Sequence, residues 1–126
     1  MRLTICLTAA AALCASSTAA DSKPAAFQLN ETSWTYVDKG TKVRETIDKD
    51  GNYIENAVSG KHIDHGTAVL KDGKACFTSS MTKEGELCWT APRYALKIGQ
   101  SFVAKSDKGR KLRVTRIKYT VLKMPS

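Results

Sequence analysis

Short turn signals punctuate this 126-residue chain from residue 38 onward, and they constrain its fold more than any other feature. Each places a glycine at or just after a short acidic residue, and the glycine supplies the positive φ that tight hairpin turns need. The signals are Asp38-Lys39-Gly40, Asp50-Gly51-Asn52, Asp64-His65-Gly66, Asp72-Gly73, Glu84-Gly85 and Asp107-Lys108-Gly109. Their close spacing leaves room only for short elements, so the sequence predicts a succession of β-hairpins.

Between these turns, apolar side chains recur at every second position. The segments 94–98 and 112–114 both alternate in this way, and Val43 and Ile47 share one face of a further segment. A period of two is that of a half-buried strand, and no segment after the leader keeps a helical period. We therefore predict an all-β fold, a small antiparallel sandwich or barrel of about seven or eight strands. The apolar phase slips near residues 115–117, which predicts a bulge there.

The N-terminal 20 residues are typical of a secretory signal peptide. Arg2 precedes an apolar run that ends near Ala15, and small residues follow as far as Ala20. The run is too short for a membrane-spanning helix, which needs about 20 apolar residues, and no second apolar run follows. We predict cleavage after Ala20, no transmembrane anchor, and a protein that is periplasmic or secreted.

The domain organisation follows from this leader. We assign residues 1–20 to the signal peptide, residues 21–30 to a flexible lead-in with Pro24, and residues 31–126 to a single β-domain. A chain of this length supports one domain with a modest core.

The four cysteines fall into two pairs. Cys6 and Cys14 lie in the leader, whereas Cys76 and Cys88 flank the Glu84-Gly85 turn. In an exported protein the second pair predicts a disulfide between neighbouring strands. A zinc site would need more ligands, and a redox pair would favour closer spacing. Because side chains alternate, we expect the aromatic residue after each cysteine to face the core, opposite the disulfide.

The charge is concentrated near the C-terminus. The chain has 20 basic and 12 acidic residues, a formal net charge of +8, and the segment 105–123 holds eight basic residues against one acid. We predict that this hairpin binds an anionic polymer or an acidic protein surface. The candidate anion-binding residues are Lys108, Arg110, Lys111, Arg113, Arg116 and Lys118. The alternative is that these charges protect an edge strand from pairing with other chains. Export argues against nucleic acid as the partner.

The string His62-Ile63-Asp64-His65 is the most enzyme-like feature of the sequence. Histidine with a carboxylate suits a zinc site or a general acid–base pair, so a small hydrolase or metal-binding protein is an alternative function. In a regular strand, however, His62 and Asp64 share a face and His65 points away. The string also matches the other turn signals, which favours an exposed turn. No Gly-x-Ser-x-Gly nucleophile elbow and no glycine-rich phosphate loop occurs, so we predict no enzyme, no catalytic residues and no cofactor.

Trp34 and Tyr36 alternate on one face near the start of the domain. Two interpretations remain open for them. They anchor the first strand in the core, or they form a platform for a ligand.

The phrases Asp72-Gly73-Lys74-Ala75-Cys76-Phe77 and Cys88-Trp89-Thr90 resemble those of a group of small uncharacterised secreted proteins of alphaproteobacteria. The resemblance implies a signal peptide and a disulfide-stapled β-domain outside the cytoplasm, and it implies no catalytic residues. In general plan the chain is also similar to small β-barrel inhibitors from bacterial envelopes, so a periplasmic protein inhibitor is a further alternative. The function we predict first is an exported, non-enzymatic binding or envelope protein.

Overall fold

The computed structural model describes residues 11–15 and 23–125. Most of the predicted signal peptide lies outside these residues, and so does its predicted cleavage site. Residues 11–15 are exposed and form no regular element. Within the part of the chain that the structure describes, no helix is long and apolar enough to cross a membrane.

The described chain forms eight β-strands, which confirms the predicted all-β fold. Their bounds are β1 Thr32–Asp38, β2 Thr41–Ile47, β3 Asn52–Ala57, β4 His62–Lys71, β5 Lys74–Ser79, β6 Glu86–Thr90, β7 Ser101–Lys105 and β8 Lys111–Ile117. All pairings are antiparallel, in the order β6-β5-β4-β3-β2-β1-β8-β7.

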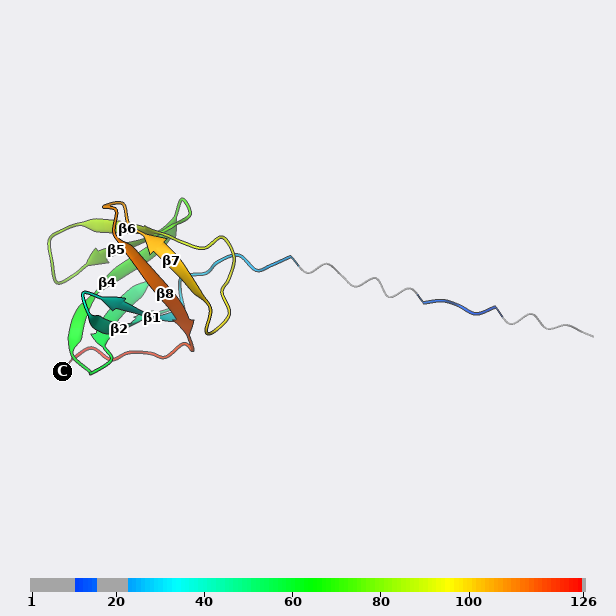
Figure 1. Ribbon diagram of the computed structural model, residues 1–126, viewed down its shortest axis with the longest axis horizontal. Helices are drawn as coiled ribbons and strands as arrows, with labels where there is room; N and C mark the ends of the chain where they lie inside the picture. Colours follow the sequence, from blue (N-terminus) through cyan, green and yellow to red (C-terminus); the bar gives the residue numbers. More distant parts are fainter. Residues whose placement is uncertain (1–10, 16–22, 126) are drawn as a thin grey trace, which may run out of the picture.

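The sheet curls into a nearly closed barrel (Figure 1). β7 and β6 are the two edges of the sheet, and they meet at one end, where Trp89 and Ser106 form an isolated bridge. The Asp107 amide also donates to the Cys88 carbonyl (3.0 Å), and the Lys105 amide donates to Thr90 Oγ1 (2.9 Å). These few bonds join the two edges at that end of the barrel.

Strand alternation separates an inner from an outer face all round the barrel. Inner positions carry the core, which is aromatic and small aliphatic in character. The buried cluster consists of Phe27, Leu29, Trp34, Ile47, Tyr53, Ala68, Ala75, Ala104 and Val114. Outer positions are mainly polar or charged.

One end of the barrel is closed by the segment that precedes β1. The sequence suggested a flexible lead-in over residues 21–30, but Phe27 and Leu29 are buried in the barrel. Backbone bonds to the β6–β7 connection hold them there, from the Phe27 amide to the Arg93 carbonyl and from the Ala95 amide to the Ala25 carbonyl. Burying these two apolar side chains offsets the entropy lost by ordering the segment.

Five of the six turn signals lie in turns or loops between strands, and the sixth does not. Asp64-His65-Gly66 lies inside β4, and the β3–β4 turn is formed by residues 58–61 instead. Gly66 is needed there for space and not for a positive φ. A Cβ at Gly66 would lie 2.0 Å from the Thr78 carbonyl oxygen of the neighbouring strand. The glycine therefore permits a close approach of β4 to β5.

Two further predictions about the strands are wrong. Residues 94–98 form no strand beyond a single bridge at Tyr94, and their alternation belongs to the connection that closes the barrel base. The register of β8 is regular against β7 and, over residues 115–117, against β1, so there is no bulge at residues 115–117. A register shift occurs instead between Glu55 and Asn56, opposite β4.

The apolar phase slip near residue 117 comes from the C-terminal segment leaving the sheet. After β8 the chain crosses the outer face of β1 and β2, where the Thr120 carbonyl accepts from Thr46 Oγ1 (2.7 Å). The Thr120 amide donates to Ser33 Oγ (3.0 Å). This covers Ser33, which is wholly buried although it occupies an outer position.

Cys76 and Cys88 form the predicted disulfide, directly across the β5–β6 ladder. As expected, Phe77 and Trp89 face the barrel interior while the disulfide occupies the outer face. The Glu86 carboxylate lies beside the two sulfurs.

Candidate functional site

A cavity of about 250 Å³ occupies the interior of the barrel. Its wall reaches from Phe27 and Leu29 at the closed base to Thr82, Glu84 and Gly85 in the β5–β6 loop at the other end. The volume is a little below the usual range for ligand pockets, about 300–1,000 Å³, so the space suits a small ligand. No sequence motif pointed to it, because the cavity exists only once eight strands are wound together.

Seven aromatic side chains line this cavity. Phe27 comes from the segment before β1, and the other six come from five strands: Trp34, Tyr36, Tyr53, Phe77, Trp89 and Phe102. Trp34 packs edge-on against Phe102 with ring centroids 5.9 Å apart, and Tyr53 packs edge-on against Phe77 at 5.2 Å. Both Trp34 and Tyr36 therefore anchor β1 in the core, as one interpretation held, and both also line the cavity. A role as a ligand platform stays a prediction.

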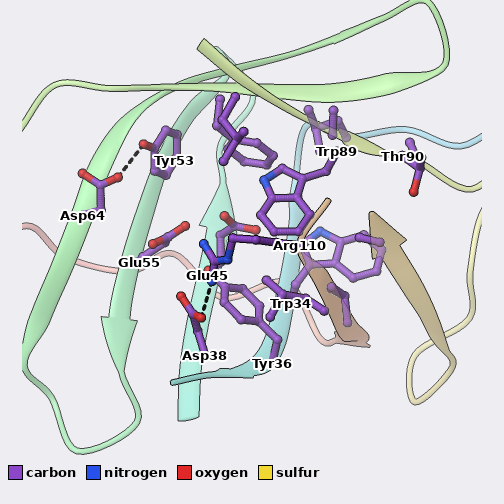
Figure 2. A pocket seen from close by; sticks show the side chains of 18 of the residues that line it. Trp34, Tyr36, Asp38, Glu45, Tyr53, Glu55, Asp64, Trp89, Thr90 and Arg110 are labelled. Carbon is purple, nitrogen blue, oxygen red and sulfur yellow. Dashed lines mark hydrogen bonds and ion pairs between the residues drawn. The ribbon is translucent and has the colours of Figure 1, made fainter. Parts of the chain in front are cut away.

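Three carboxylates stand in one row across the cavity wall. Glu45 on β2 is the register partner of Glu55 on β3, which is in turn the partner of Asp64 on β4. Trp34 extends the row on β1, opposite Glu45. Figure 2 shows these side chains directed into the same interior space.

Asp64 is held at the end of this row by two hydroxyl groups. Tyr53 Oη donates to Asp64 Oδ2 at 2.8 Å, and Ser79 Oγ donates to Asp64 Oδ1 at 2.6 Å. Ser79 Oγ also accepts from the Met81 amide at 3.0 Å, which orients its proton toward Asp64. Burial, with the adjacent Asp64 carboxylate, raises the pKa of the Tyr53 phenol, so it remains a donor at any physiological pH.

Burial of Glu45 and Glu55 in the cavity costs folding free energy. Glu45 is only 7% exposed, and burial, followed by the neighbouring Glu55 carboxylate, raises its pKa well above the ordinary value. Burial is also the first cause of the raised pKa of Glu55. Because burial raises the pKa of both groups and Glu55 raises that of Glu45 further, this pair binds a proton more readily than two exposed carboxyls would. Burial and the adjacent acids raise the pKa of the Tyr36 phenol in the same region.

Arg110, from the turn between β7 and β8, also lines the cavity. Its guanidinium is paired with Asp38, as Figure 2 shows. It also lies 5.7 Å from the centre of the Trp89 ring. Among the described residues it is the one basic side chain in the cavity lining, against five acids: Asp38, Glu45, Glu55, Asp64 and Glu84. The interior is therefore acidic, although the protein as a whole is strongly basic.

The structure places the predicted anion-binding residues in different surroundings. Arg110 lines the cavity and pairs with Asp38, and the Arg116 guanidinium donates to the Leu96 carbonyl. The other four are exposed and make no ion pair with a described residue: Lys108, Lys111, Arg113 and Lys118. Lys111 lies directly opposite Lys105 on the outer face of the β7–β8 hairpin, next to Arg113.

The predicted His62–Asp64–His65 cluster is also divided by the fold. The register shift at Glu55/Asn56 leaves Ile63 as an extra residue, so His62 pairs with Asn56 while Asp64 pairs with Glu55. Asp64 therefore enters the cavity, and both histidines lie outside. The assumption of a regular strand was wrong here, because a bulge reverses the alternation of side chains.

Sequence reasoning missed Glu45 and Glu55, although their signal is present. Each occupies the middle of an alternating triplet whose outer members are apolar, Val43-x-Glu45-x-Ile47 and Tyr53-x-Glu55-x-Ala57. A carboxylate at the apolar phase of a strand, repeated on neighbouring strands, is the pattern of an acidic barrel interior.

Searches against protein-family models, curated proteins and solved structures find no match to this chain.

Proposed function

We propose that this protein is an exported, non-enzymatic binding protein whose barrel cavity binds a small organic cation. The ligand class is an amine or a quaternary ammonium ion with a compact apolar body. The observation that carries the proposal is the row of Glu45, Glu55 and Asp64 inside an aromatic wall. Export is part of the proposal and rests on the leader and on the Cys76–Cys88 disulfide.

The free energies of burial support a cation over a neutral ligand. Carboxyl groups in an apolar interior cost folding free energy unless they are paired. An ammonium ion would replace a proton of the Glu45–Glu55 pair and would meet the faces of Trp34, Tyr36 and Trp89 through cation–π attraction. A neutral apolar ligand would gain only the aromatic contacts and would leave the carboxylates without a partner.

The proposal is tested with choline and its neutral isostere 3,3-dimethylbutan-1-ol. The protein has two tryptophans, Trp34 and Trp89, and both line the cavity, so intrinsic fluorescence reports its occupancy directly. We expect the cation to change the fluorescence saturably and to bind at least tenfold more tightly than the alcohol.

Variants locate the effect. Glu45→Gln with Glu55→Gln should weaken binding of the cation at least tenfold, whereas Glu31→Gln, at an exposed acid, should leave it unchanged. Equal binding of the cation and the alcohol to the wild-type protein, or no loss in the double variant, would refute the proposal.

A second candidate function concerns the outer face of the β7–β8 hairpin. Lys105 and Lys111 form a like-charged cross-strand pair, and Arg113 is the next basic residue on the same face. Such a pair is unfavourable without a counter-charge, which supports binding of an anionic polymer or an acidic protein surface. This surface and the cavity are separate, so one protein could use both.

A further inference from the structure

The bulge in β4 brings two histidines together on the outer face of the barrel, away from the cavity. Because Ile63 is accommodated as an extra residue, His62 and His65 both point outward, on the opposite side of the strand from Asp64. They are the two histidines of the whole chain. Their rings lie with centroids 5.2 Å apart and planes inclined by 35°.

A hydrogen bond from the neighbouring strand orients the first ring. His62 Nδ1 lies 2.7 Å from Asn56 Oδ1, an oxygen that can only accept, so Nδ1 carries the proton. In the neutral ring, His62 Nε2 then holds the lone pair and accepts a hydrogen bond from His65 Nδ1 at 3.0 Å. A metal ion would replace this hydrogen bond, with the His65 proton moving to its Nε2. A ring proton fixed by a carbonyl oxygen, with the lone pair on the other nitrogen, is the usual arrangement behind a metal-ligating histidine.

The spacing of the two nitrogens also suits coordination. Imidazole nitrogens bind Zn²⁺ at about 2.0–2.1 Å, so two of them on one ion stand roughly 3 Å apart. Among the described residues, the one cluster of three metal-ligating side chains within reach of each other is Cys76, Glu86 and Cys88, whose sulfurs are joined in the disulfide. The histidine pair supplies two ligands, and water would complete the shell.

We propose that His62 Nε2 and His65 Nδ1 together bind one divalent ion of the type that prefers imidazole, Zn²⁺ or Cu²⁺, on the outer face of β4. Asn56 is a positioning residue, and Asp64 takes no part. Because protons compete with the metal for the ring nitrogens, binding weakens as the pH falls.

Titration of the full chain with Zn²⁺ at pH 7.5, followed by NMR of the ring nitrogens and protons, tests this site. With two histidines in the chain, every imidazole signal is assignable from the two single variants. We expect both rings to shift together and to saturate at one Zn²⁺ per chain. His62→Gln or His65→Gln should lower the affinity at least tenfold, and Asn56→Ala by about tenfold.

The double variant His62→Gln with His65→Gln measures background binding, including binding to the exposed free thiol of Cys14. Near-ultraviolet circular dichroism shows that each variant folds. Imidazole signals that stay unmoved at saturating Zn²⁺, or a double variant with wild-type affinity, would overturn the proposal. A shift of one ring alone would also refute the two-ligand site.

Discussion

The inner and outer faces of this barrel carry opposite charge, although both are formed by the same strands. Inside, Glu45 and Glu55 lie among aromatic rings, where burial raises the pKa of each. Outside, Lys111 and Arg113 stand in water. Successive side chains of a strand point to opposite faces, so acidic residues can gather inside while basic residues lie outside. The net charge of +8 therefore gives no sign of the acidic interior.

The two faces differ most in how much their charged groups reduce the stability of the fold. A lysine in solvent changes stability by little, whereas an unpaired buried carboxyl costs free energy that folding must offset. The interior acids are therefore the stronger indication of a ligand. The outer charges are compatible with binding, with protection of the β7 edge, or with both.

The largest expected effect concerns the inner side of β4. Gly66→Val places side-chain atoms where a Cβ already lies 2.0 Å from the Thr78 carbonyl oxygen, so β4 and β5 must separate. We expect a loss of about 3 kcal/mol or more in the free energy of unfolding, measured by urea denaturation. The matched outer variant Thr67→Ala should change it by less than about 1 kcal/mol. Equal effects would show that the inner face is not tightly packed here.

The next largest effect is on the pH dependence of stability, which the interior acids should change. Glu45 and Glu55 keep protons in the folded state at pH values where the unfolded chain, with a reference value of 4.5, has lost them. Their contribution to stability is thus present below pH 4.5 and is lost as the pH rises toward the folded pKa values. We expect wild type to lose up to about 1.4 kcal/mol per pH unit relative to the Glu45→Gln, Glu55→Gln variant. Parallel curves for the two proteins between pH 4 and 8 would contradict raised pKa values.

Arg110 occupies the boundary between the two faces. Because its guanidinium competes for the acids of the cavity, Arg110→Gln should tighten choline binding by about three- to tenfold, as Asp38 also becomes free. The same fluorescence titration measures this. Lys108→Gln, in the adjacent turn and outside the cavity, is the control and should have no effect. Weaker binding in Arg110→Gln would mean that the arginine contacts the ligand favourably.

The outer face should show the smallest effect on stability. Lys111→Gln with Arg113→Gln should change the free energy of unfolding by less than about 0.5 kcal/mol. The same change should reduce retention on a heparin column at low salt, and wild-type retention should fall steeply as salt rises. Retention that is independent of salt would argue against an electrostatic anion surface.

The fold could be predicted from the sequence because its signals are local. Turn dipeptides and period-two alternation define hairpins, and the Cys76–Cys88 pairing follows from the turn between them. The site could not be predicted in the same way, because it depends on closure of the barrel and on the register of β4 against β3. One extra residue at Ile63 moved Asp64 into the cavity and both histidines outside. Phe27 and Leu29 are likewise buried only because the barrel is present, and the residues around them in the sequence do not indicate this burial.

The most direct test of cation binding in the cavity is whether the bound cation displaces a proton from the Glu45–Glu55 pair. Calorimetric titration with choline at several pH values above 4.5, in buffers of different ionisation enthalpy, counts protons exchanged with the solvent. We expect release of up to one proton for each cation bound by the wild type, and none by the Glu45→Gln, Glu55→Gln variant. Tight binding of choline with the same heat in every buffer would contradict it.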